Sequence, residues 1–250
     1  MARKGGSLES LIESADIGVE VLHPGGLELT AELAGLCRIA PGSRVIDVAS
    51  GTGESACYLA ERFHCRVTGV DMSDFLLEKA RKKAREKGLD VRFLKADAHS
   101  LPFPEGSFDA AVSECTLCLL DKPRAIGEMV RVVRGGGHVG MSDVSWRPGT
   151  PEKVRRKLLE LEGESPETLQ GWAGLFREAG LVDCVTVDRS ELLARWVRDM
   201  RKRMGVSGQA RVFLKVLFRW GFPGLARALR SERIFLGPHA GYGIVACRKP

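Results

Sequence analysis

The chain has 250 residues, a net charge of +6 and an apolar fraction of 44%, which exclude a disordered or collagen-like protein. No apolar run reaches the roughly 18 residues of a transmembrane helix, and Met1–Gly6 lacks the apolar core of a signal peptide, so we expect a cytoplasmic protein. The seven cysteines form an odd set without a paired framework, which favours reduced thiols over disulfides.

Strand and helix patterns alternate along the chain. A short helix is expected within 7–22 and another over 27–36. We expect strands at 44–48, 66–70, 91–95, 110–113, 138–141, 185–187 and 243–247. We expect helices at 54–63, 74–87, 122–133, 151–163 and 167–179. This alternation predicts an α/β fold with a mostly parallel sheet that helices cover on both faces.

The segment 191–240, before the last strand, is predicted to be an inserted helical cap. Leu193, Trp196 and Met200 recur at helical spacing, and 212–220 is densely apolar. We expect a lid whose apolar face covers a substrate and whose basic face is solvated. The alternative is a peripheral contact between this basic cap and an anionic membrane surface.

The positive charge is concentrated in and after this cap. From residue 201 onward, eleven Lys and Arg residues accompany a single acid, Glu232, so this part carries +10 while the whole chain carries +6. The first 200 residues are therefore slightly acidic. No recognised nucleic-acid-binding module accompanies the basic residues, and we expect no nucleic-acid partner.

The first strand leads into a loop of small residues, Ala49-Ser50-Gly51-Thr52-Gly53, and a helix begins at once. Glycines let the backbone approach a ligand closely, and the free N–H groups at the start of the helix suit a nucleotide-like molecule. The second strand leads to Asp71, where a carboxylate in a doubly wound sheet can accept the hydroxyls of a ribose.

Together with Asp47 just before the loop, these residues resemble the class I S-adenosylmethionine-dependent methyltransferases. Lys95–Phe103, Ser107–Asp109 and Arg131–Gly137 resemble further landmarks of that family, in the same order. The resemblance implies a Rossmann-like, doubly wound seven-stranded sheet whose last strand is antiparallel, with S-adenosylmethionine as cofactor. It also implies that residues 1–43 form a helical segment that closes the cofactor pocket.

The resemblance implies a division of the chain and a set of cofactor-binding residues. Residues 44–190 and 241–250 would form the core, and 191–240 the cap. Asp47 would approach the cofactor's amino group, Asp71 its ribose hydroxyls, and Asp97 its adenine amino group. The full set expected to hold the cofactor is Asp47, Ala49, Gly51, Gly53, Asp71, Met72, Asp97, Ala98 and Glu114.

A dehydrogenase that binds NAD is the alternative outside this class. Gly51-x-Gly53-x-x-Ala56 also satisfies the dinucleotide-binding pattern. Asp47 weighs against this alternative, because a carboxylate beside the loop is a poor neighbour for a pyrophosphate and a good one for an ammonium or sulfonium.

The expected reaction is methyl transfer to a small-molecule or lipid- or quinone-like acceptor. His23, Glu114 and Cys115 are the candidate catalytic residues, and Asp143 is a further acid–base candidate at a strand end. A lone histidine beside Pro-Gly-Gly is also a common structural hydrogen-bonding residue, so both roles stay open for His23.

A second alternative is arsenite methylation, because Val112–Leu119 resembles the corresponding segment of arsenite methyltransferases. Cys115, Cys118 and Cys57 would supply soft thiolate ligands for the metalloid. A further thiol is expected where Thr168 stands, and Cys184 would be its displaced substitute. Small apolar fillers are the other interpretation of these cysteines, and we expect no bound metal.

Overall fold

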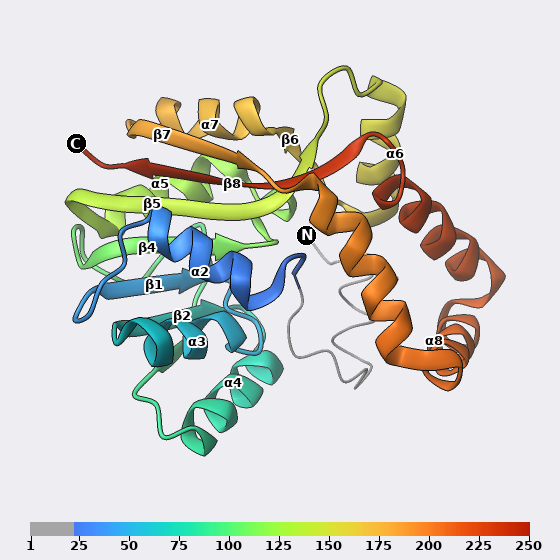
Figure 1. Cartoon of the computed structure of the whole chain (residues 1–250), viewed down its shortest axis with the longest axis horizontal. Helices are drawn as coiled ribbons and strands as arrows, with labels where there is room; N and C mark the ends of the chain where they lie inside the picture. The colour runs from blue at the N-terminus through green and yellow to red at the C-terminus, as the bar shows by residue number, and fades with distance from the viewer. Residues whose placement is uncertain (1–22) are drawn as a thin grey trace.

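The computed structural model describes residues 23–250, so the helix expected within 7–22 lies outside the described residues. In them, one sheet has the strand order β3-β2-β1-β4-β5-β8-β7, and β6 pairs with β5 (Figure 1). The strands are β1 (Arg44–Val48), β2 (Arg66–Asp71), β3 (Arg92–Lys95), β4 (Phe108–Glu114), β5 (Val133–Trp146), β6 (Glu167–Thr168), β7 (Val182–Asp188) and β8 (Ala240–Arg248).

This topology confirms the predicted doubly wound, Rossmann-like sheet. The strands β1 to β5 pair in parallel, and β8 is antiparallel to both of its neighbours. The two-residue β6 is the one addition to the seven strands expected from the sequence. The strand order reverses beside β1, so a crevice opens at the carboxyl ends of β1 and β4, where open α/β sheets bind ligands.

Helices cover both faces of the sheet and create two apolar clusters. One cluster packs α2 (Gly26–Leu36), α3 (Glu54–Phe63) and α4 (Asp74–Glu86) on one face. The other packs α5 (Lys122–Val132) and α7 (Leu169–Glu178) on the opposite face. Because helices lie on both sides, β1 is buried along 45–48 and carries a nearly continuous apolar run. The remaining short elements are the 3₁₀ turn η1 (Leu117–Leu119) and α6 (Glu152–Glu162).

The fifth strand is much longer than the expected 138–141, since β5 continues to Trp146. Its extension carries Ser142, Asp143 and Ser145, which are at most 2% exposed. Polar residues at these positions suggest a loop when the sequence is considered alone. Pairing with β8 from His138 to Trp146 buries them instead, and Glu114 and the Cys118 N–H are hydrogen-bond partners of Ser142 and Asp143, respectively.

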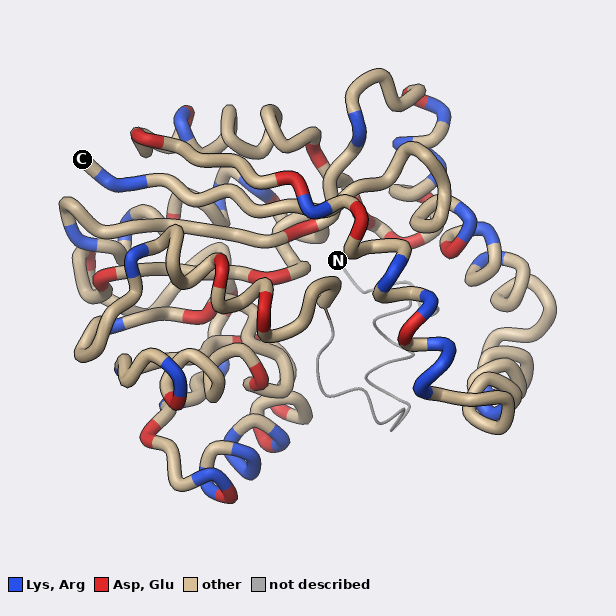
Figure 2. Tube along the Cα trace, viewed as in Figure 1, with Lys and Arg blue, Asp and Glu red and all other residues tan. Residues whose placement is uncertain are grey.

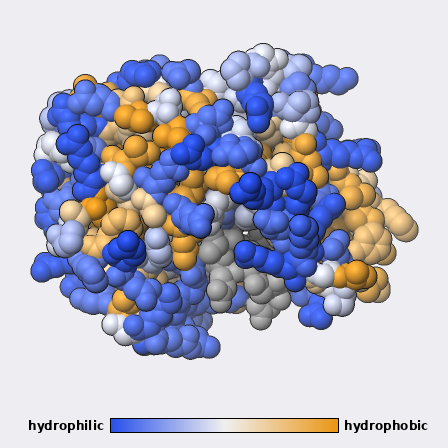
Figure 3. All heavy atoms as spheres, viewed as in Figure 1, coloured by the Kyte–Doolittle hydropathy of each residue, from blue (hydrophilic) through white to orange (hydrophobic). Residues whose placement is uncertain are grey.

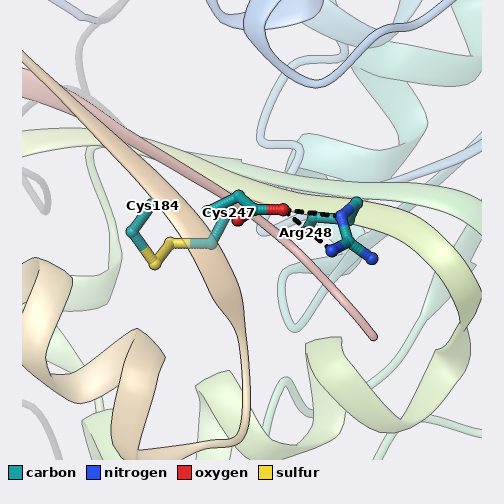
Figure 4. Close-up of a disulfide and its surroundings, with 4 residues drawn as sticks. Cys184, Cys247 and Arg248 are labelled. Atoms are coloured by element: carbon teal, nitrogen blue, oxygen red, sulfur yellow. Dashed lines mark hydrogen bonds and ion pairs between the residues drawn. A yellow bond between two sulfur atoms is a disulfide. The ribbon is translucent and has the colours of Figure 1, made fainter.

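A disulfide joins the two strands at this edge of the sheet, so the expectation of reduced thiols is wrong for this pair. Cys184 on β7 is bonded to Cys247 on β8, and the ion pair between Arg248 and Asp183 lies beside them (Figure 4). The number and spacing of the cysteines in the sequence do not indicate this pair. Its members are 63 residues apart and become neighbours only through the antiparallel register of β7 and β8. The other five cysteines are not in disulfides.

We expect reduction of this disulfide to lower the free energy of unfolding by about 2–4 kcal/mol, because it restores conformational freedom to a long loop of the unfolded chain. Urea unfolding with and without dithiothreitol measures the difference. Cys184→Ser should match the reduced wild type and should not respond to reductant. Titration of seven thiols, rather than five, in the unreduced unfolded protein would contradict the pairing.

The helix α8 (Ser190–Phe235) follows β7 and precedes β8 in the chain, and it projects beyond the end of the sheet (Figure 1). Gly205 (φ 59°) and Gly221 (φ 64°) bend it into three helical segments, 190–204, 206–220 and 222–235. A positive φ is accessible to glycine without steric cost, so these two residues set the bends. Arg189 donates two hydrogen bonds to Glu32 of α2 (3.0 and 2.5 Å) and ties the start of α8 to the core.

None of the helices in residues 23–250 has the length and apolar character needed to cross a bilayer.

Candidate functional site

A cavity of about 790 Å³ lies between the carboxyl ends of the central strands and α8. From the core it is lined mainly by the loops after β1, β2, β3 and β4. The predicted cofactor residues on its wall are Asp47, Ala49, Gly51, Asp71, Met72, Asp97, Ala98 and Glu114. All three segments of α8 contribute to the opposite wall, which is mostly apolar.

The first loop has the backbone shape that a close ligand requires. Ala49 (φ 63°) and Gly51 (φ 53°) both adopt left-handed conformations directly after β1. Asp71 joins this loop to the second one, because its Oδ2 accepts from the Gly51 N–H (2.9 Å) and its Oδ1 from the Ser73 N–H (2.8 Å). Two oxygens offer about four acceptor positions, so this carboxylate retains capacity for ligand hydroxyls.

Gly53 has a packing role that differs from the role expected of it. It is not among the residues that line the cavity, and it precedes the first residue of α3 with φ 73°. A Cβ at this position would lie 2.6 Å from the Phe93 ring and 2.8 Å from Ala80. Gly53 therefore allows α3 to pack closely against β3 and α4.

Asp47 fits a positively charged ligand group. Its side chain lines the cavity, the residue is 2% exposed, and Oδ2 has no hydrogen-bond partner among the described residues. Burial, followed by the charges of Glu114 and Asp71, raises the pKa of this carboxyl well above its usual value. An ammonium group bound here would supply the missing donor and favour the charged carboxylate. The expected cofactor carries such a group.

The far end of the cavity can hold a flat ring. Met72 is 58% exposed and borders the cavity together with the buried Ala98. Asp97 Oδ1 accepts from the His99 backbone N–H (2.9 Å), and this hydrogen bond is the main cause that lowers the pKa of Asp97. An ionised carboxylate at the cavity edge accepts hydrogen bonds, as recognition of an exocyclic amino group requires.

His23 and Glu114 line the cavity together with the loops after β1 and β2 and with α8. His23 Nε2 lies 3.6 Å from Glu114 Oε2, and both side chains are less than a tenth exposed. Thr30 Oγ1 donates to Glu114 Oε2 (3.0 Å), and Ser142 Oγ donates to Oε1 (3.2 Å). These donors hold the carboxylate in place beside the imidazole. Ser55 Oγ lies 3.5 Å from the same imidazole nitrogen.

The surroundings of His23 indicate which ring nitrogen carries the proton. Nδ1 lies 3.3 Å from the Pro24 carbonyl oxygen, which can only accept, so Nδ1 is assigned the proton. Nε2 is then the accepting nitrogen, and the hydroxyl groups of Thr30 (3.4 Å) and Ser55 (3.5 Å) lie next to it. Arranged in this way, the imidazole can remove a proton from a ligand, and Glu114 can stabilise the resulting imidazolium.

Sequence patterns alone did not single out Thr30, Ser55 or Ser142. They lie on α2, α3 and β5, and only the folded chain brings them to one point. A polar residue inside an apolar helix or strand pattern was the one available signal.

The cysteines do not form the ligand set that arsenite binding requires. Cys115 lines the cavity with φ 56°, but Cys57 and Cys118 are buried and absent from its walls. Cys184 is bonded to Cys247 and is therefore no thiol ligand. Residues 23–250 contain no group of three or more His, Cys, Asp or Glu side chains placed to hold a metal ion.

Asp143 is fully buried and absent from the cavity wall, so its position does not support the acid–base role considered for it. Its carboxylate accepts from the backbone N–H groups of Cys118 (3.1 Å) and Val144 (2.7 Å), which fixes the chain after β4. Burial raises the pKa of this carboxyl from its ordinary 3.8 to about 6.

The raised pKa of Asp143 makes the free energy of unfolding depend on pH. The folded protein holds this proton more tightly than the unfolded chain, so the stabilisation is complete below pH 3.8 and is lost as the pH rises through about 6. Across this window, we expect the free energy of unfolding of the wild type to fall by about 3 kcal/mol relative to Asp143→Asn. Urea unfolding at several pH values measures it, and a pH-independent difference would contradict the expectation.

Comparisons with known proteins show the class of this chain. Residues 45–137 match the family model described as a methyltransferase domain. Methyltransferase GfsG of Streptomyces halstedii is 32% identical over 243 residues, which are 93% of this chain and 83% of that protein. These matches overturn the NAD-dependent alternative, since the loop that suggested it lies within the matched residues.

A second group of relatives is longer than this chain. Phosphoethanolamine N-methyltransferase 1 of Arabidopsis thaliana is 30% identical over 175 residues, covering 70% of this chain and 36% of the relative. The chain thus spans about a third of the length of such relatives.

Among solved structures, the [4+2]-cyclase SpnF has a TM-score of 0.81 and 26% identity, and the match covers 97% of this chain and 92% of that one. Phosphoethanolamine N-methyltransferase 2 of Haemonchus contortus in complex with S-adenosylmethionine has a TM-score of 0.78 and 20% identity, with 97% and 57% covered. The latter likeness shows the fold alone.

Proposed function

Because the chain belongs to the class I S-adenosylmethionine-dependent methyltransferases, we propose that it methylates a hydroxyl or amine of an apolar small molecule bound beneath α8. The observation that carries this proposal is the position of His23 and Glu114, which face one cavity between the cofactor loops and the apolar wall of α8.

The residues present fit the cofactor. When bound, S-adenosylmethionine supplies a methyl group activated by its sulfonium. Asp47 would bind the amino group, since its buried Oδ2 lacks a donor, and Asp71 would accept the ribose hydroxyls beside Gly51. Asp97 and Ala98 would receive the adenine, with Met72 packed on the ring. These loops and His23 line the same cavity, so the loops would hold the cofactor within reach of an acceptor beside His23.

The wall opposite the cofactor loops indicates an apolar acceptor. The cap residues on it are mainly large and apolar: Leu193, Trp196, Val197, Met200, Met204, Val212, Phe213, Val216, Leu225, Leu229 and Phe235. The two charged cap residues there, Arg201 and Glu232, form an ion pair at 2.5 Å. An acceptor with a large charged group would leave that charge without a partner at this wall, whereas a quinone-like or lipid-like body would bury its surface.

His23 is proposed as the general base. A hydroxyl is a weak nucleophile while it keeps its proton, so the attacking oxygen would give that proton to Nε2 as its bond to the methyl carbon forms. The bond from that carbon to sulfur would break at the same time, with S-adenosylhomocysteine as the leaving group. Glu114 would stabilise the imidazolium, and solvent would take the proton after product release. The apolar wall of α8 would limit the access of water to the reacting groups and help to keep them in line.

The proposal is tested by supplying methyl-labelled S-adenosylmethionine to the purified protein with an extract of its own host cells, followed by solvent partition. Label in an organic-soluble small molecule supports the apolar acceptor. Label confined to water-soluble metabolites would overturn the assignment of the α8 wall. Heat-inactivated protein controls for other methyltransferases in the extract.

A second candidate is cyclisation of an apolar molecule, favoured by the likeness to the [4+2]-cyclase SpnF over 97% of the chain, cap included. A cyclisation product has the same mass as its precursor, while a methylated product is heavier by one methylene. The presence of the His23–Glu114 pair favours methyl transfer, because that reaction benefits from a base.

A further inference from the structure

The middle segment of α8, 206–220, has a second face that the cavity does not use. Its inner side contributes Val212, Phe213 and Val216 to the acceptor wall. Phe218 on the outer side is 86% exposed, and Phe222, just after the bend at Gly221, is 77% exposed. Figure 3 shows apolar surface gathered at the end of the molecule that α8 forms.

Basic side chains accompany these aromatic rings. Arg211 and Lys215 are four residues apart and lie on the same side of the helix as Phe218. With Arg203 and Ser207 they line a surface cavity of about 200 Å³, separate from the acceptor cavity. The three cations form no ion pair with any described residue, whereas Arg201 on the inner side is paired with Glu232. Figure 2 shows further Lys and Arg residues along α8.

We propose that this outer face, made of Arg203, Arg211, Lys215, Phe218 and Phe222, docks on an anionic lipid bilayer. Charge complementarity selects this occupant: the unpaired cations match phosphate headgroups, and exposed aromatic rings beside them are suited to the boundary between headgroups and acyl chains. A soluble polyanion would match the cations and leave the two phenylalanines exposed to water.

The two faces of 206–220 connect docking to catalysis. Val212 of this segment and Met204, just before the bend at Gly205, belong to the walls of both cavities, so α8 borders the surface cavity on one side and the acceptor site on the other. An apolar acceptor dissolved in the bilayer then reaches the cavity through the cap without crossing water. This part rests on the proposed function, while docking itself is measured without any methyl transfer.

Vesicle sedimentation tests the docking. The full chain is mixed with vesicles of phosphatidylcholine alone or with an equal share of phosphatidylglycerol. We expect binding to the anionic vesicles only, weakened as salt is raised from about 0.1 M to about 0.5 M. Arg211→Glu with Lys215→Glu should lower the affinity at least about twentyfold, and Phe218→Ser with Phe222→Ser about tenfold.

The control variant has the same change of charge at two residues outside α8. Lys82→Glu with Arg85→Glu alters two exposed basic residues of α4 and should bind vesicles as the wild type does. S-adenosylhomocysteine binding reports that each variant is folded, since none of these side chains lines the large cavity. Absence of binding at low salt overturns the proposal. Binding that the phenylalanine changes leave intact also overturns it, in favour of a soluble polyanion.

Discussion

His23→Gln is expected to lower kcat by about a hundredfold or more, which is the usual range for loss of a general base. Glutamine preserves a polar group of similar length, but it cannot take a proton from the acceptor. Cofactor affinity should stay within about threefold of the wild type, because His23 contacts Glu114, Thr30 and Ser55 rather than the loops after β1 and β2. Initial rates with saturating cofactor and titration with S-adenosylhomocysteine separate the two effects.

Glu114→Gln tests whether the imidazole and the carboxylate act as a unit. If Glu114 works by stabilising protonated His23, the double variant should be little slower than His23→Gln alone. Cys115→Ser is the matched control, since it alters the neighbouring cavity residue and leaves the pair intact. We expect it to retain most of the activity. A large loss in Cys115→Ser, together with an active His23→Gln enzyme, would transfer the catalytic role to the thiol.

Asp71→Ala is expected to weaken S-adenosylhomocysteine binding by about a hundredfold, the effect of losing two charge-assisted hydrogen bonds to ribose hydroxyls. The Asp71 carboxylate also accepts from the Gly51 and Ser73 N–H groups and so orders the two loops before the ligand binds. The alanine change removes these two hydrogen bonds as well. Calorimetric titration measures the affinity, and a thermal melt reports on folding. Asp90→Ala, an exposed acid between α4 and β3, is the control. Unchanged affinity in a folded Asp71→Ala protein would refute the ribose assignment.

The sequence sufficed for those parts of the fold that depend on local pattern. The helix 54–63 was predicted with its observed bounds, and the strand 66–70 was one residue short. Both have short-range signals: the strand is a short run rich in β-branched residues that ends at Asp71, and the helix has an apolar stripe of helical period. The family landmarks lie in this same region, so the loops that line the cavity after β1 and β2 could be located before the structure.

The features that the sequence missed depend on distant partners. Ser142 and Asp143 are polar, yet they belong to the core of β5 because Glu114, Tyr242 and the Cys118 N–H satisfy them. The bond between Cys184 and Cys247 likewise depends on the register of two antiparallel strands.

The proposed catalytic pair, His23 and Glu114, likewise depends on distant elements of the chain. His23 and Glu114 were each selected as candidates, but only the folded chain brings them within 3.6 Å. Hydroxyl groups from α2 and β5 orient the carboxylate, and no sequence spacing relates those elements.

The most direct test of methyl transfer is the stoichiometry of one turnover reaction with the acceptor found by labelling. Acceptor consumed, product mass and S-adenosylhomocysteine formed are measured together. The account predicts one S-adenosylhomocysteine for each acceptor consumed, with the product heavier by one methylene. Acceptor converted to a product of unchanged mass, with no S-adenosylhomocysteine formed, would contradict it and make this cavity the site of a cyclisation.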